Sequence, residues 1–313
     1  MPERETIPVV LFAYDRPAHL RRVLDALRTN RIPCLYTFSD GPRGAAQAER
    51  VAEVRRTLRA VDWCECVHVA RERNQGLGTS ILSGVASVLD RHDAAIVFED
   101  DLLCAPGTYA WLNAALNRYR DEPRVLSVSA WTHARVTPGG LENQPFFSGR
   151  CNTLAWGAWR RTWTGMDRDA REMIRECRSL GIDPYRYGAD LPVYAEEERH
   201  RNIWAVRLIY NHLRRGALCL CPARSMIQHI GYDSLATNAN RDEGWADPPP
   251  APAPPPPAVW PDPREHPESP ALWQRACGAR PGAVRYWAGR IRRTVARIAR
   301  RAATRPSPMG AGV

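Results

Sequence analysis

The sequence predicts an α/β protein built on a mostly parallel sheet. Short apolar runs of strand length alternate along the first part of the chain with segments of helical spacing, which is typical of this class. Residues 94–98 form the clearest run, because every one is apolar and a strand covered by helices on both faces needs no polar side. The run ends abruptly in three carboxylates, Glu99, Asp100 and Asp101.

The predicted elements follow one another in order. Pro17 suits the first position of a helix, and Leu20, Val23, Leu24 and Leu27 recur behind it at helical spacing. Turn-forming and chain-breaking residues separate the later elements. We expect strands at residues 7–13, 34–38, 64–70, 94–98, 125–130 and 218–221, and further helices at residues 45–58, 79–89, 108–119, 167–180 and 204–213.

Polar residues follow four of these strands at the point where each strand ends. They are the pair Asp15 and Arg16, then Asp40, Asn74 and residues 99–101. In open sheets of this kind ligands bind beyond the carboxyl ends of the strands, so we expect these groups to meet at one edge. Three adjacent carboxylates repel one another and resist burial, which a divalent cation or ligand hydroxyls would offset. The alternative is an acidic strand end that only faces water.

Composition limits the class of protein. The chain has 313 residues, a formal net charge of +10 and no lysine. All its basic side chains except histidine are therefore arginines, which bind phosphates with two parallel hydrogen bonds. The first residues do not resemble a signal peptide, no apolar run reaches membrane-spanning length, and the nine cysteines are scattered. These features predict a cytoplasmic protein whose cysteines are buried thiols and not metal ligands.

Several segments resemble bacterial family-2-type glycosyltransferases. They include Asn74-Gln-Gly-Leu-Gly-Thr-Ser-Ile81, Phe98-Glu-Asp-Asp-Leu102 and Val128-Ser-Ala-Trp131, together with residues 8–17, 151–159 and 228–234. The segments are also similar to eukaryotic N-acetylglucosaminyltransferase I. The resemblance covers residues 7–240 and implies a GT-A fold and a nucleotide-sugar donor, with UDP favoured. It also implies a divalent cation, Mn²⁺ or Mg²⁺, and inversion at the anomeric carbon.

The resemblance implies roles for single residues at the ends of the strands. Asp101, the last acid of the Glu-Asp-Asp motif, would bind the metal directly. Glu99 and Asp100 would face the donor sugar and the ribose. Arg16, which follows the first strand, would help to hold the nucleotide. This reading requires the Asp101 carboxylate to face a cavity, and a buried ion pair between Asp101 and an arginine would argue against it.

Three further residues lie where the family contacts its donor. Asp40 would accept a hydrogen bond from the uracil imide, and Asn74 and Gly76 belong to a loop that passes the donor. Each has a structural alternative, because Asp is favoured at turns and the Asn74–Gly76 stretch could serve only as the turn into a helix.

The later part of the chain offers a base and a second metal contact. For inversion a carboxylate must take the acceptor proton, and Asp190 is our candidate, with a helix cap as the alternative. Asp169 and Asp183 are weaker candidates. His229 would contact the metal or the diphosphate, although the family often has Asn there and a lone His is more often structural.

Two groups of residues in this part are expected to be mainly structural. Glu196, Glu197 and Glu198 read as a solvated helical face. Of the tryptophans at 156, 159 and 163, we expect only one in the cleft, because large aromatic residues at such spacing belong more often to a core.

We expect residues 1–246 to form the catalytic domain, with a nucleotide-sugar-binding half at 1–131 and an acceptor-side half at 132–246. The proline-rich residues 247–267 predict a stiff linker. Residues 268–313 form a basic tail, whose residues 284–303 predict an amphipathic helix that favours an anionic membrane surface. We expect no nucleic acid partner, because no such binding motif accompanies the charge. A disordered tail is the alternative.

The sequence therefore favours a metal-dependent inverting glycosyltransferase whose acceptor is a glycan or a lipid-linked glycan. One alternative is a nucleotidyltransferase, which would normally carry a glycine-rich phosphate loop directly after the first strand. Residues 14–17 do not form such a loop. The other alternative is a non-catalytic nucleotide-sugar-binding module at the membrane surface.

Overall fold

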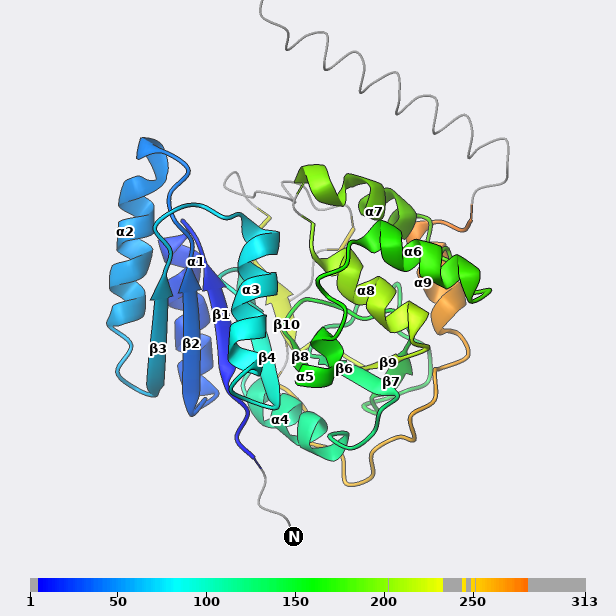
Figure 1. Ribbon diagram of the computed structural model, residues 1–313. Coiled ribbons are helices and arrows are strands. Elements are labelled where there is room, and N and C mark those ends of the chain that lie inside the picture. Colours follow the sequence, from blue (N-terminus) through cyan, green and yellow to red (C-terminus); the bar gives the residue numbers. More distant parts are fainter. Residues whose placement is uncertain (1–4, 202, 233–243, 246–248, 251, 281–313) are drawn as a thin grey trace, which may run out of the picture.

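A computed structural model describes residues 5–201, 203–232, 244–245, 249–250 and 252–280. A sheet of eight strands runs through it, in the order β3-β2-β1-β4-β8-β6-β9-β7 (Figure 1). The α3 helix lies in front of β1 and β4 in this view, and α1 lies behind the same part of the sheet. The predicted mixed α/β class, with helices on both faces of a large central sheet, is confirmed.

Four parallel strands form the first half of the sheet. They are β1 (Val9–Ala13), β2 (Cys34–Ser39), β3 (Glu65–Ala70) and β4 (Ala94–Glu99). All of β1 and all of β4 except its last residue are buried, which is why both read as unbroken apolar runs. The helices that connect them are α1 (Pro17–Thr29), α2 (Ala45–Arg59) and α3 (Leu77–Leu89).

The second half of the sheet is mixed. Strand β8 (Trp156–Trp159) runs antiparallel to both β4 and β6 (Val125–Ser129). Strand β9 (Leu218–Cys221) is parallel to β6 and antiparallel to β7 (Phe146–Ser148). The helices of this half are α4 (Thr108–Arg118), α5 (Arg160–Trp163), α6 (Ala170–Ser179), α7 (Asp190–Arg201) and α8 (Ala205–Arg214).

A small second sheet joins two distant parts of the chain. Strand β5 (Leu102–Cys104), directly after the three carboxylates, pairs antiparallel with β10 (Ile227–His229). The register sets His229 opposite Leu102, and the Ile230 N–H continues the ladder to the Asp101 carbonyl at 2.9 Å. This pairing was not predicted, and it brings His229 beside Asp101.

The proline-rich segment differs from the expected linker. Trp260 packs against the rings of Trp111 and Tyr119, and the Tyr119 hydroxyl donates to the Pro261 carbonyl at 2.6 Å. The chain then forms α9 (Ser269–Cys277), whose Trp273 is buried. The described part of residues 249–280 therefore packs against the body and does not act as a spacer. The division into domains stays a prediction, and the expected basic helix at 284–303 lies outside the described residues.

Two acidic side chains have structural roles instead of the roles that we expected for them. Asp169 caps α6, because its carboxylate accepts from the Glu172 N–H at 2.9 Å, and Glu172 reaches back to the Asp169 N–H in a capping box. Glu198 is buried and pairs with Arg207, so the prediction that it belongs to a solvated face was wrong. In the part of the chain that the structure describes, no helix has both the length and the apolar character needed to span a bilayer.

Candidate functional site

A cavity of about 920 Å³ lies beyond the carboxyl ends of β1, β2 and β4. This volume is typical of pockets that bind small molecules and cofactors. The residues that the sequence pointed to all line this cavity, so the chain brings them together as expected. They are Arg16, Asp40, Asn74, Gly76, Glu99, Asp100, Asp101, Asp190 and His229.

Glu99 and Asp100 are held close to a third carboxylate. The Asp100 carboxylate accepts a hydrogen bond from the Tyr14 N–H at 2.9 Å, which ties the end of β1 to the end of β4. Burial, together with the charges of Asp101 and Asp100, raises the pKa of Glu99 well above its usual range. Burial and the charge of Asp101 raise the pKa of Asp100 to about 7, against the lowering effect of the Tyr14 hydrogen bond.

Asp101 is the carboxylate of this group whose charged form is favoured by its neighbours. Its Oδ2 lies 2.9 Å from a guanidinium nitrogen of Arg16 and 3.2 Å from Nε2 of His229. Burial alone would raise the pKa of Asp101, but the hydrogen bond and charge of His229 and the charge of Arg16 hold it below its usual range. A Cβ atom on Gly231 would lie 2.3 Å from Oδ2 and 2.7 Å from the Arg16 nitrogen, so only glycine leaves room for this pair.

One distance fits a dication between Asp101 and His229. Two ligand atoms at about 2.1 Å from an octahedral cation, at right angles, are about 3.0 Å apart, and Oδ2 and Nε2 are 3.2 Å apart. Within the described residues Nδ1 of His229 is buried and has no hydrogen-bond partner, whereas a metal-binding histidine usually donates its second ring N–H to an acceptor. No third His, Cys, Asp or Glu among these residues completes a metal site. The remaining ligands would be phosphate oxygens and water.

The Arg16–Asp101 pair is the buried ion pair with an arginine that we gave as one of two arguments against a metal at Asp101. The Asp101 carboxylate lines the cavity, as the metal role requires. Its partner Arg16 is only 7% exposed, so the two side chains form a buried ion pair. A dication would therefore have to compete with Arg16 for this carboxylate.

Asp40 holds the loop that precedes α3. Its Oδ1 accepts from the N–H groups of Gly41 and Gln75, and its Oδ2 accepts from those of Gln75 and Gly76, all at 2.9–3.0 Å. Asn74 donates its side-chain amide to the Gly41 carbonyl at 2.8 Å, and Gly76 has a φ of +78°, which favours glycine. The turn-forming alternative thus describes what these side chains do here, and their contact with a donor stays a prediction.

A second arginine–aspartate pair lines the other part of the cavity. Arg150 donates to both oxygens of Asp190, at 3.0 and 2.7 Å, and to the Tyr187 carbonyl at 2.9 Å. The face of its guanidinium lies 4.2 Å from the centre of the Trp273 ring. Asp190 is the first residue of α7, which is close to the helix-cap position that we gave as the alternative. Its carboxylate is thus held in one orientation by a buried cation.

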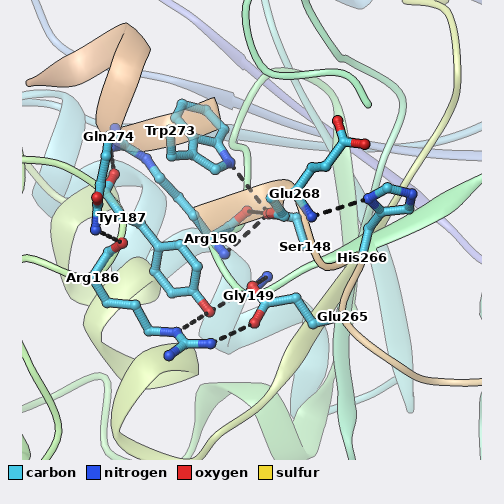
Figure 2. A network of polar contacts seen from close by, with 11 residues as sticks. Ser148, Gly149, Arg150, Arg186, Tyr187, Glu265, His266, Glu268, Trp273 and Gln274 are labelled. Atoms are coloured by element: carbon cyan, nitrogen blue, oxygen red, sulfur yellow. Dashed lines mark hydrogen bonds and ion pairs between the residues drawn. The ribbon is translucent and has the colours of Figure 1, made fainter. Parts of the chain in front are cut away.

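A polar network anchors α9 beside this pair (Figure 2). Glu265 accepts from the Tyr187 hydroxyl at 2.7 Å, the Gly149 N–H at 3.0 Å and Arg186 at 2.9 Å. The Trp273 indole N–H donates to the Ser148 hydroxyl at 3.2 Å. The segment after the proline-rich stretch therefore builds one wall of the cavity.

The aromatic residues of the cavity are not those that we expected. Trp156 is buried, stacks on Trp163 and packs against Trp204, and none of the tryptophans at 156, 159 and 163 lines the cavity. That prediction was wrong, because these side chains fill the space between β8 and the helices. The tryptophans that do line it are Trp131, Trp204, Trp245 and Trp273.

Sequence reasoning missed Arg150 and Trp273 altogether. Arg150 directly precedes a segment that the resemblance had marked, but nothing in its neighbourhood signals a long-range partner. Trp273 lay in the presumed tail. An apolar cluster within 268–277, with Pro270 near its start, is the signal that could have identified α9.

No protein-family model and no curated protein matches this sequence. Among solved structures the chain is similar to a mannosyltransferase from Pyrobaculum calidifontis in complex with GDP-Man and Mn²⁺, with 14% identity and a TM-score of 0.36. That match covers 60% of this chain and 50% of the mannosyltransferase. A UDP-glucose pyrophosphorylase complexed with UDP-glucose matches with 11% identity and a TM-score of 0.35, over 72% of this chain and 93% of the other.

A third similar structure is a 4-diphosphocytidyl-2C-methyl-D-erythritol synthase from Anaerococcus prevotii. It has 8% identity and a TM-score of 0.32, over 56% of this chain and 77% of the other. At identities of 8–14% and TM-scores of 0.32–0.36, these likenesses carry no argument about function. The chain spans half the length of the first of these structures.

Proposed function

We propose that this protein is a GT-A glycosyltransferase that uses a divalent cation, Mn²⁺ or Mg²⁺, and a nucleotide-sugar donor. The observation that supports this most is the arrangement of Asp101, His229 and Arg16 on the wall of a large cavity at the carboxyl ends of the parallel strands. A carboxylate and an imidazole that face each other suit Mn²⁺. An arginine beside them suits the phosphates of a nucleotide.

In this proposal the residues at the ends of the strands divide the work of binding the donor. Asp101 and His229 hold the dication, which neutralises the charge that develops on the leaving nucleoside diphosphate. Arg16 binds the diphosphate, and Glu99 faces the donor sugar. Asp100 stays braced against Tyr14 and contacts the ribose. Asp40 orders the loop that contains Asn74 and Gly76 against the base.

Asp190 is the carboxylate that lines the cavity from the acceptor-side half, and we propose that it receives the proton of the acceptor hydroxyl. Arg150 fixes the orientation of Asp190 in the cavity. The proposed acceptor is a hydroxyl of a glycan or a lipid-linked glycan.

The proposal is tested by a thermal-shift panel of UDP, GDP and dTDP sugars, each with and without Mn²⁺. We expect one nucleotide sugar to raise the melting temperature only when Mn²⁺ is present. The variant Asp101→Ala should keep the fold and lose donor turnover by about a thousandfold, because it lacks the carboxylate that anchors the metal.

The reaction class is read from the products. Glycosyl transfer or donor hydrolysis releases a nucleoside diphosphate, whereas a nucleotidyltransferase consumes a nucleoside triphosphate and releases pyrophosphate. Release of pyrophosphate would replace our proposal with the nucleotidyltransferase alternative. Wild-type turnover in Asp101→Ala would exclude the metal assignment.

A further inference from the structure

One oxygen of Asp101 already has two partners, Arg16 and His229, so a dication that binds this oxygen would compete with Arg16. Oδ2 accepts from Arg16 at 2.9 Å, and the same oxygen faces Nε2 of His229 at 3.2 Å. A dication held jointly by Asp101 and His229 would have to bind this oxygen. Arg16 and a dication cannot share it, because they repel each other and fill the same space.

Arg16 is built to leave this oxygen without disturbing the fold. Its backbone lies between β1 and α1, where it precedes Pro17 and its carbonyl accepts from the Leu20 N–H in the first turn of the helix. The side chain is long and reaches Asp101 through a single nitrogen. Gly231 packs directly against both groups, because a Cβ atom there would lie 2.3 Å from Oδ2 and 2.7 Å from the Arg16 nitrogen. A movement of Arg16 is therefore directed into the cavity that it lines, and it needs no change in the backbone of α1.

We propose that Arg16 is a latch that competes with the dication for Asp101 and moves to the diphosphate when the donor binds. This inference rests on the proposed function and specifies how its metal and nucleotide sites communicate. Without a nucleotide, Arg16 neutralises Asp101 and lowers the affinity of the site for the cation. A diphosphate gives Arg16 a second anionic partner, so nucleotide and cation bind with positive coupling.

The test is a titration of Mn²⁺ into the full-length protein, with the free ion measured by electron paramagnetic resonance. It is carried out without nucleotide and then with saturating UDP or GDP. The variants are Arg16→Gln, which removes the charge, and Arg16→Lys, which keeps it. The matched control is Arg21→Gln on the same helix, because Arg21 pairs with Glu53 at the surface, away from the cavity.

We expect UDP or GDP to tighten Mn²⁺ binding to the wild-type protein about tenfold, a common size for coupling between two sites. Arg16→Gln should bind Mn²⁺ about tenfold more tightly than the wild type when no nucleotide is present, so the coupling should shrink to the part that comes from phosphate oxygens binding the cation directly. Arg16→Lys and Arg21→Gln should both retain the coupling. Circular dichroism of each variant checks that the comparison is made between folded proteins.

Two results would overturn the latch. If Arg16→Gln binds Mn²⁺ alone no better than the wild type, the cation does not compete with Arg16, and the proposed function stands without the latch. If no variant binds Mn²⁺ under any condition, the latch fails together with the metal part of the proposed function. Calorimetry of UDP and GDP without metal then shows whether the nucleotide part survives.

Discussion

The two arginine–aspartate pairs of the cavity are chemically alike but are held very differently. Arg150 contacts both oxygens of Asp190, donates to a backbone carbonyl and lies flat on Trp273. Arg16 reaches one oxygen of Asp101, and that oxygen also faces His229. Both oxygens of Asp190 are held by its arginine, whereas the oxygen of Asp101 that binds Arg16 is shared with His229. We infer that Arg150 serves to hold Asp190 in place, whereas Arg16 itself takes part in binding.

The surroundings of each pair explain this difference. Arg150 lies where β7, the start of α7 and the anchored α9 converge, so its partners come from elements that pack on one another (Figure 2). Asp101 and Arg16 lie at the carboxyl ends of β4 and β1, where the sheet stops and the cavity begins. Rigid support behind one pair and open space before the other fit the two roles.

The largest difference should appear in stability. Replacing Arg150 by Met leaves the Asp190 carboxylate buried without its cation, and we expect a loss of about 3 kcal/mol in the free energy of unfolding. Arg16→Met should cost less, about 2 kcal/mol, because Asp101 is as buried as Asp190 but keeps its contact with His229. Urea unfolding of the wild type and both variants measures this. Equal losses in the two variants would show that our contrast between the pairs is wrong.

The part of the molecule that contains β6 and α8 includes a buried histidine, His212, which makes the stability of the protein depend on pH. His212 donates through Nδ1 to the Leu208 carbonyl and accepts through Nε2 from the Ser127 hydroxyl, both at 2.8 Å. Burial lowers the pKa of His212 from 6.5 to about 4, so the folded protein keeps it neutral where an unfolded chain binds a proton. Stability is therefore lost as the pH falls from about 6.5 to about 4, by about 3 kcal/mol in total.

The variant His212→Gln should lack this part of the pH dependence. Urea unfolding of wild type and variant at several pH values between about 4.5 and about 7.5 gives the difference directly, because the carboxylates contribute equally to both proteins and cancel. If the free energy of unfolding changes with pH in the same way for both proteins, His212 is not a buried histidine that stays neutral in the folded protein.

The acceptor-side pair can also be tested through the proposed reaction. Asp190→Asn keeps the size of the side chain but removes the group that takes the proton, so transfer should fall about a hundredfold. Donor binding, measured by calorimetry, should not change, because the donor residues belong to the other half of the cavity. Transfer at the wild-type rate would mean that Asp190 serves only to hold Arg150 and that the base is another group.

The sequence predicted the parts of this molecule that depend on local signals. The strands at 94–98 and 7–13 and their polar ends were identified because apolar runs and strand ends leave a local pattern, and those residues do meet at one cavity. His229 and Asp101 are 128 positions apart in the chain, and their contact depends on the pairing between β5 and β10. No pattern within either segment predicts that pairing.

The prediction that the proline-rich segment is a stiff linker was wrong for a related reason. Its composition is that of a linker, but Trp260 gives it a large apolar anchor, and Trp273 in α9 anchors the segment that follows. The energy of burying these side chains is decided by pockets made elsewhere in the chain. The same holds for the tryptophans at 156, 159 and 163, whose spacing does not reveal whether a core or a cavity receives them.

The smallest expected effect tests the anchor of α9. Glu265→Gln keeps the shape of the side chain but weakens its charged hydrogen bonds to Arg186, Tyr187 and the Gly149 N–H, so unfolding should become easier by about 1 kcal/mol. Glu268→Gln is the matched control, because Glu268 is exposed on the same segment and should change stability by only a few tenths of a kcal/mol. Urea unfolding compares the two, and equal stability would show that Glu265 does not hold α9 in place. In that case the rigid support that we assign to Arg150 must come from Trp273 and α7 alone.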